Sequence, residues 1–245
     1  MKFSYSAIWD DTVALIRAHG SLIAALAGVF IFLPSLLLAY LLPQPVATEP
    51  GQLIALMSEY LRANWMWLLL ENLLNMIGAI AILRLALHEG SSTVAGVIGA
   101  AFALLPFYFL ASLLSSILIG IGFALLIVPG LYLVGRLTPL GAVIVAEDRR
   151  NPIDALRRSF EVTKGRGWAI FGLVLVVAIA GIIVTVVINN LFGALFLIVA
   201  GKDLGLFLTL VLASATGAAF VALLATLYAA IYRNVAGGSS AKVFQ

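Results

Sequence analysis

Long apolar segments recur along the whole chain, and they constrain its fold more than any other feature. Hydrophobic residues make up 63% of the 245 residues and charged residues only 10%, whereas ordinary soluble domains are about 25% charged. A water-soluble fold of this composition would expose large apolar patches. Six segments approach the roughly 20 apolar residues that a membrane-crossing helix needs: 21–42, 65–87, 107–127, 130–147, 168–189 and 206–232. We therefore predict one all-α domain, a polytopic integral membrane helix bundle.

The segment before the first span has the pattern of a surface helix. Residues 6–19 place Trp9, Val13 and Ile16 on one helical face, and Gly20 is suited to end the helix. We therefore predict that this helix is amphipathic and lies on the membrane, separate from the span that follows.

Proline and glycine mark further boundaries along the chain. Pro106 is expected to separate a second surface helix, residues 92–105, from the third span. The pair Pro129-Gly130 predicts a tight turn before the short fourth span. Residues 190–203 fit either a surface helix or an extension of the fifth span.

A third surface helix is predicted at residues 151–164, where Asn151 can cap the helix, Pro152 suits its first position and Gly165 can end it. Its apolar stripe consists of Ile153, Leu156 and Phe160. The basic residues in and beside it are Arg149, Arg150, Arg157, Arg158, Lys164 and Arg166. A basic amphipathic helix is attracted to anionic headgroups, so these residues are candidate lipid ligands. The alternative interpretation is a connector whose charges only fix the topology.

The basic residues lie mainly on one side of the predicted topology. If both termini are cytoplasmic, Arg62 and Lys202 lie outside, Arg136 lies within a span, and the other Lys and Arg residues all lie inside. The opposite orientation conflicts with the positive-inside rule. An odd number of spans would distribute these charges over both sides. We therefore expect six spans with both termini in the cytoplasm.

Polar residues inside the spans are candidate functional residues because they are costly in hydrocarbon. Glu71 and Arg136 are expected at similar depths in the outer leaflet, so an ion pair between them is a hypothesis, with Asn72 and Asn75 completing a polar network. A second pair, Arg84 with Glu147, is predicted at the inner interface. Such a network fits either a site for an ion, headgroup or solute, or a structural clamp.

The stretch from Pro129 to Trp168 combines a Pro-Gly pair, a Leu/Tyr run, a mid-span arginine, an acidic exit and a proline-capped basic helix ending in Lys-Gly-x-Gly-Trp. The residues of this pattern are Pro129, Gly130, Arg136, Pro139, Glu147, Pro152, Ala155, Leu156, Ser159, Thr163, Gly165 and Trp168. The pattern resembles that of YciC-type bacterial inner-membrane proteins and of the membrane domain of some glycerophosphoryl diester phosphodiesterases. The resemblance implies a six-span protein of the bacterial cytoplasmic membrane with an envelope or lipid-linked role. It does not imply diesterase activity, which belongs to a separate soluble domain.

The sequence offers no arrangement typical of catalysis. His19 and His88 have no acidic partners at metal-ligand spacing, and neither is placed to complete a serine triad. We predict no catalytic residue, metal, cofactor or nucleic-acid partner. Membrane lipids are the expected partners, with other membrane proteins as further candidates. The favoured function is a non-enzymatic envelope or lipid-linked one. A small-solute transporter or channel with a polar site at Glu71 and Arg136 is the first alternative, and an intramembrane enzyme is the second.

Overall fold

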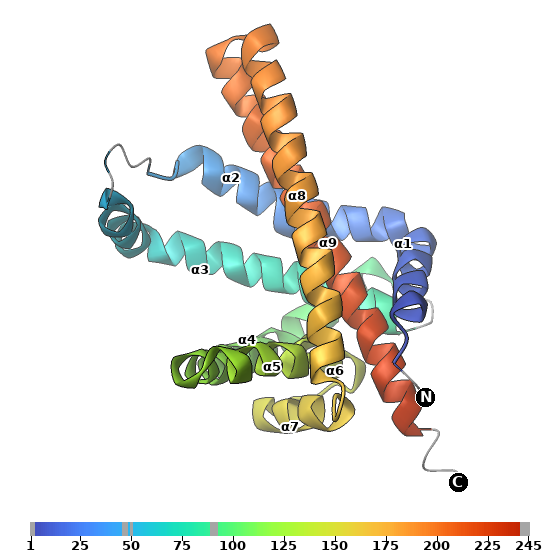
Figure 1. The fold of residues 1–245 in the computed structure, drawn as a ribbon. Helices are drawn as coiled ribbons and strands as arrows, with labels where there is room; N and C mark the ends of the chain where they lie inside the picture. Colours follow the sequence, from blue (N-terminus) through green and yellow to red (C-terminus); the bar gives the residue numbers. More distant parts are fainter. Residues whose placement is uncertain (1–2, 46–48, 50, 89–92, 241–245) are drawn as a thin grey trace.

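The computed structural model of the chain describes residues 3–45, 49, 51–88 and 93–240, and the regular elements among them are all helices (Figure 1). Six helical segments are long and apolar enough to cross a membrane: Tyr5–Leu41, Gln52–Leu87, Val94–Leu125, Ile127–Ala146, Gly167–Ala200 and Lys202–Gly237. The protein is thus an all-α, multi-pass membrane protein. Lys2, Lys242 and residue 92, where the second surface helix was predicted to begin, lie outside the described residues.

The first span is one uninterrupted helix. It consists of α1 (Tyr5–Ala27), a π-helical segment (Gly28–Phe32) and α2 (Leu33–Leu41). No helix end separates residues 6–19 from the span, although Figure 1 shows the first part of α1 lying at a steep angle to the part that follows. A glycine inside a helix costs only about 1 kcal/mol relative to alanine, and burial of Ile8, Leu15 and Ile23 along one side of α1 offsets that cost. Gly20 therefore does not end the helix.

The second and third spans are α3 (Gln52–Leu87) and α4 (Val94–Leu125). Pro106 lies inside α4, so the predicted break at this residue is wrong, and the predicted surface helix 92–105 corresponds to the first half of α4. Proline is tolerated inside membrane helices when neighbouring helices and local adjustments satisfy the freed backbone groups. Burial of Ala101 and Leu104 just before Pro106 shows that this part of α4 packs against the bundle.

The fourth span is divided between α5 (Ile127–Leu137) and α6 (Leu140–Ala146). The predicted turn at Pro129-Gly130 is wrong, because the chain turns at the extended residue Leu126 and Pro129 lies in the first turn of α5. Proline is tolerated in a first turn because its missing N–H would have no intrahelical partner. α6 ends at a left-handed Asp148, with φ 47°, and the Arg149 amide donates to the Ile144 carbonyl over 3.0 Å. This pattern is a Schellman-type helix end.

The last three helices are α7 (Pro152–Val162), α8 (Gly167–Ala200) and α9 (Lys202–Ser240). Residues 190–200 extend the fifth span, which resolves the alternatives left open by the sequence. The amide of Asn189 donates to the Thr185 carbonyl at 2.8 Å and to the Thr216 hydroxyl of α9 at 3.0 Å, so this polar residue is accommodated inside α8. Gly201, with φ 77° and ψ −179°, reverses the chain in a conformation that is essentially restricted to glycine.

The buried core lies where the helices converge, not along their whole length. α6 is the most enclosed element, and residues 142–145 are almost completely buried. Figure 1 shows α2–α3 and α4–α5 extending to one side and α8–α9 extending to another, while the last turns of α9 lie at the same end of the molecule as α7. We call the convergence region, residues 77–88, 137–170 and 222–237, the base. Beyond the base the helices separate, and their exposed apolar side chains face the surroundings, as expected for a protein bathed in lipid.

α7 closes the base instead of lying free on the membrane. Asn151 caps it, as predicted, by accepting from the Ile153 amide at 3.0 Å, and Pro152 occupies the first turn. Gly165, at φ 74°, turns the chain toward α8. The buried face of α7 is formed by Ala155, Leu156, Ser159 and Val162. Of the predicted stripe, Leu156 is buried and Phe160 half-buried in the base, whereas Ile153 is 62% exposed.

Candidate functional site

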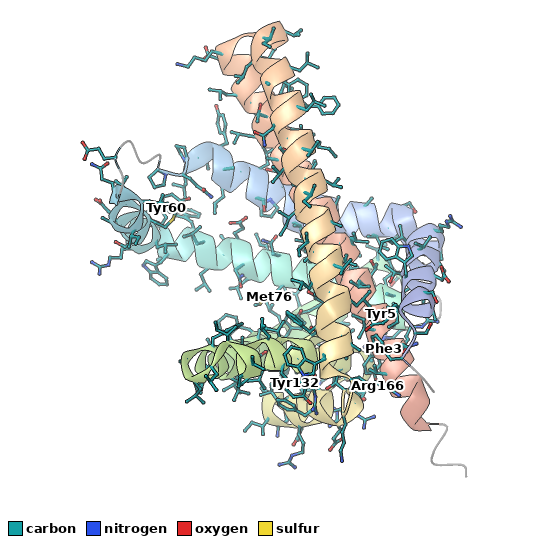
Figure 2. All side chains as sticks on the ribbon, viewed as in Figure 1. Phe3, Tyr5, Tyr60, Met76, Tyr132 and Arg166 are labelled. Atoms are coloured by element: carbon teal, nitrogen blue, oxygen red, sulfur yellow. The ribbon has the colours of Figure 1, made fainter. Side chains whose placement is uncertain are left out.

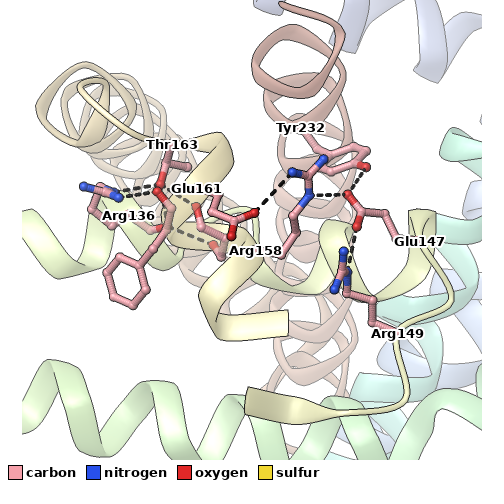
Figure 3. A network of polar contacts seen from close by, with 9 residues as sticks. Arg136, Glu147, Arg149, Arg158, Glu161, Thr163 and Tyr232 are labelled. Carbon is pink, nitrogen blue, oxygen red and sulfur yellow. Dashed lines mark hydrogen bonds and ion pairs between the residues drawn. The ribbon is translucent and has the colours of Figure 1, made fainter. Parts of the chain in front are cut away.

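The strongest concentration of charge in the structure surrounds Glu147, directly after α6 (Figure 3). Its carboxylate accepts from Arg149 Nε at 2.6 Å, from Arg158 Nε at 2.9 Å and from the Tyr232 hydroxyl at 2.9 Å. Arg158 also reaches Glu161 at 3.3 Å. We call these five residues the base cluster. Because they belong to the end of α6, to α7 and to α9, the cluster ties three parts of the base together.

The base cluster keeps Glu147 ionised. Burial alone would raise the pKa of its carboxyl, but hydrogen bonds from the two guanidiniums and the tyrosine hydroxyl outweigh burial and hold the pKa below its ordinary value. The same contact raises the pKa of the Arg158 guanidinium. The Glu147 side chain is only 19% exposed, so its ion pairs are screened less than ordinary surface pairs.

Arg136 forms a second polar centre, in which it binds α7 instead of an acidic residue. Its guanidinium donates to the Thr163 hydroxyl at 2.8 Å, to the Tyr132 hydroxyl at 2.8 Å and to the Phe160 carbonyl. That carbonyl belongs to the last turn of α7, where backbone acceptors have no intrahelical donor and a positive charge is favourable. In return, the Ser159 hydroxyl donates to the Arg136 carbonyl at 2.9 Å. The ends of α5 and α7 therefore cap each other.

Two glycines allow this arrangement. A Cβ atom on Gly135 would lie 2.1 Å from the Gly167 carbonyl oxygen, and one on Gly167 would lie 2.7 Å from the Tyr132 ring and 2.8 Å from Arg136 Cδ. Any larger side chain at either position would push α5 away from the start of α8. The glycines thus bring the Arg136 guanidinium within reach of α7.

The outer surface of the base carries basic and apolar side chains together. Arg157 and Lys164 are exposed and make no ion pair within the described part of the chain. Arg150 is also exposed and has only a long 3.7 Å contact with Asp148. Ile153 and Trp168 are exposed beside them. This combination of long cations and apolar anchors is typical of a membrane-surface helix.

The structure does not bring Glu71 and Arg136 together, so this predicted pair is wrong. Glu71 accepts instead from the Ser35 hydroxyl of α2 at 2.7 Å. Asn72 is exposed, and the buried Asn75 Oδ1 accepts no hydrogen bond from the described residues. Depth along a span placed Glu71 and Arg136 at the same level, but the lateral positions of the helices separate them.

The predicted pair between Arg84 and Glu147 is also wrong, because no ion pair joins them among the described residues. Arg84 lies near His88, where burial and the arginine charge lower the pKa of the imidazole. Of the six headgroup candidates, Arg149 and Arg158 are held by Glu147, and Arg166 has an intramolecular contact of its own. Arg150 has only its long contact with Asp148, and Arg157 and Lys164 make no ion pair with another described residue.

Sequence reasoning missed the tyrosines of both polar centres. Tyr232 contacts Glu147 across 85 residues of sequence separation, and nothing in the local pattern indicates that contact. Tyr132, by contrast, lies four residues before Arg136, a spacing that allows contact on one helical face. Within the described residues, no three His, Asp or Glu side chains lie close enough together to hold a metal ion. Neither a family model, nor a curated protein, nor a solved structure matches the chain.

Proposed function

We propose that this protein is a non-enzymatic component of the bacterial cytoplasmic membrane that binds anionic lipid headgroups at the surface of its base. The observation that carries the proposal is the exposed basic surface formed by Arg150, Arg157 and Lys164, with Ile153 and Trp168 as apolar anchors. Each Lys or Arg near an anionic membrane surface contributes about 1 kcal/mol of attraction. The anchors would hold α7 at the level of the headgroups.

The distribution of charge supports a cytoplasmic position for the base. The base contains most of the described basic residues, whereas Arg62 in the first half of α3 and Lys202 at the α8–α9 turn lie toward the other end. By the positive-inside rule, the end with more basic residues near its spans faces the cytoplasm. The start of α1 and the last turns of α9, which lie at this end in Figure 1, would then be on the cytoplasmic side too.

An envelope or lipid-linked role is part of the same proposal, and it also draws on the resemblance of Pro129–Trp168 to YciC-type proteins and to the phosphodiesterase membrane domain. The transport alternative depended on a shared site for Glu71 and Arg136. Because these residues bind different helices, that site is not formed.

Native mass spectrometry of the protein in detergent tests the proposal by counting retained lipids by headgroup class. In Arg157→Gln/Lys164→Gln, the loss of two charges, about 2 kcal/mol, should weaken retention of phosphatidylglycerol by more than about tenfold. Phosphatidylethanolamine retention should not change. The matched control Arg62→Gln/Lys202→Gln removes the same charge from the opposite end and should retain phosphatidylglycerol. Equal losses in both variants, or no loss in the first, would refute headgroup binding at the base.

A further inference from the structure

A long apolar groove runs beside α1, and no part of the described chain fills it. The part of the groove between the start of α1 and α8 holds about 600 Å³ of open space. The lining there comes from the start of α1, from one face of α8 and from a single residue of α9: Tyr5, Ser6, Trp9, Leu173, Val176, Val177, Ala180, Gly181, Val184 and Leu223. We call this space the α1–α8 groove. Its volume falls within the range of about 300–1,000 Å³ that is usual for ligand pockets.

The α8 wall of the groove is one continuous helical face. Leu173, Val177, Ala180 and Val184 follow the spacing of three or four residues that places side chains one above another. Val184 is more than half exposed although it is wholly apolar. This face therefore needs an apolar neighbour from outside the chain.

The α1 wall shows the same lack of an internal partner. α1 buries Ile8, Thr12 and Leu15 against the bundle. Trp9 and Ile16, which belong to the stripe predicted from the sequence, lie on a different face of α1 from these buried residues. Trp9 lines the α1–α8 groove, and Ile16 lines an adjoining hollow of about 370 Å³ between α1 and α9. Leu223 borders both spaces, so they meet along α1.

One end of the groove has the chemistry of a membrane interface. Tyr5 and Trp9 are exposed amphipathic aromatics, a type of residue that is enriched at headgroup level. Arg166 is the N-cap residue of α8 and lies seven residues before Leu173, about two helical turns along the axis. Figure 2 labels Tyr5 at the start of α1 and Arg166 at the start of α8. A guanidinium has five donors, so a contact within the protein leaves capacity for a phosphate.

The charges around this end do not oppose a phosphate strongly. Asp11 lies 3.5 Å from Arg233 in an ion pair. Asp10 is exposed, and its position on α1 is about a quarter of a turn away from Trp9. Ser6 is one of the residues that line the groove, and its hydroxyl lies 3.2 Å from the Ser4 hydroxyl.

We propose that the α1–α8 groove holds one phospholipid of the adjacent membrane leaflet, with an acyl chain along α8 and the phosphate toward Arg166 at the start of α8. An apolar groove at membrane depth has no water to fill it, and the surrounding acyl chains are the apolar partner that both walls lack. This site rests on the lipid-linked function proposed above but lies on a different surface from Arg157 and Lys164. It recognises a chain and a phosphate, not a net headgroup charge.

Filling the groove with a side chain tests the proposal. In Ala180→Trp the indole should displace several methylene groups of the bound chain, so native mass spectrometry of the full chain in detergent should show occupancy by one phospholipid lowered at least about tenfold. Ala213→Trp is a matched control, because Ala213 is exposed on α9 and lines neither hollow. With phosphatidylethanolamine as the lipid that is counted, it should retain the lipid, as should Arg157→Gln/Lys164→Gln. That double variant separates a failure of this site from a failure of headgroup binding at the base.

A second measurement does not depend on the folding of Ala180→Trp. With the other three tryptophans replaced by phenylalanine, Trp9 becomes the single fluorophore. Phospholipid brominated in its acyl chain should then quench Trp9 with saturation at one equivalent in detergent. Quenching that rises linearly without saturation, or equal lipid retention by Ala180→Trp and Ala213→Trp, would overturn the proposal.

Discussion

Replacing Glu147 with glutamine removes the charge at the centre of the base cluster and keeps the shape of the side chain. Glutamine still offers one acceptor oxygen, but its NH₂ group would face a guanidinium. Hydrogen bonds to charged groups contribute about 1.5–3 kcal/mol and neutral ones about 0.5–1.5 kcal/mol. Two guanidinium contacts, at 2.6 and 2.9 Å, are affected, and both arginine side chains are about one-third exposed. The difference amounts to about 2–3 kcal/mol for two contacts, and after allowance for that screening we expect Glu147→Gln to lower the free energy of unfolding by about 1–2 kcal/mol.

Unfolding in detergent micelles, followed by helical circular dichroism, measures this loss. Glu161→Gln is the control, because Glu161 is 57% exposed and makes a single 3.3 Å contact with Arg158. Exposed helix pairs of this kind contribute about 0.5 kcal/mol or less. Tyr232→Phe, compared with Tyr228→Phe, isolates the hydroxyl that reaches Glu147. Similar losses of unfolding free energy in Glu147→Gln and Glu161→Gln would refute the view that the ion pairs of Glu147 are the main polar contacts that stabilise the base.

The pH dependence of the same variant gives an independent check. Because the pKa of Glu147 is lower in the folded protein, its contribution to stability is present above the ordinary carboxyl value of 4.5 and is lost as the pH falls through the folded pKa. Glu147→Gln lacks this contribution at every pH. The difference in stability between wild type and variant should therefore narrow in acid. A difference that stays constant from neutral pH to below about pH 4 would contradict the assignment.

Three further changes test other parts of the fold. Gly135→Ala should destabilise the protein by about 1–3 kcal/mol through overpacking, because its Cβ would meet the Gly167 carbonyl. Gly172 has open space around it, so Gly172→Ala should not destabilise the protein. Thermal unfolding compares the two variants. Arg136→Lys keeps the charge but loses the fork that reaches three acceptors, and a loss of about 1–2 kcal/mol is expected in the same assay. The chain has no cysteine, so a single introduced cysteine can be labelled selectively. Lys164→Cys should react with a membrane-impermeant thiol reagent only from the cytoplasmic side, and Lys202→Cys only from the opposite side. Labelling of both variants from one side would exclude the proposed topology.

The elements that could be predicted from the sequence are those set by local chemistry. The apolar segments predicted a helical membrane protein, and the Asn151-Pro152 start of α7 depends only on adjacent backbone groups. Signals for helix ends were less reliable. Gly20 and Pro106 would break or distort many helices in water, where solvent can satisfy the freed backbone groups. Inside a membrane the helix continues through both, because leaving it would expose unsatisfied backbone groups to lipid.

The candidate pairs were less predictable because depth along a span fixes only one coordinate. Glu71 and Arg136 were expected at equal depth, yet one binds Ser35 and the other binds the end of α7. The predicted pair also assumed that Arg136 needs an acidic partner, and this assumption was too narrow. The half-buried Arg136 guanidinium instead donates to one backbone carbonyl and two hydroxyl groups, which satisfy its donors without the desolvation of a second charge.

Several residues of the stretch Pro129–Trp168 form a packing unit, and this changes where function should be sought. Gly135 and Gly167 set the distance between α5 and α8, Arg136 and Ser159 cap each other's helices, and Glu147 joins α6 to α7 and α9. Their donors and acceptors are occupied inside the protein, so they have little capacity left for a ligand. The side chains that remain available lie outside this unit, on the exposed basic surface of α7 and along the apolar groove beside α1. Both surfaces match the chemistry of phospholipids, whose headgroups are charged and whose chains are apolar. A protein whose characteristic segment is devoted to holding the base rigid is suited to present these two surfaces to lipid in a fixed geometry.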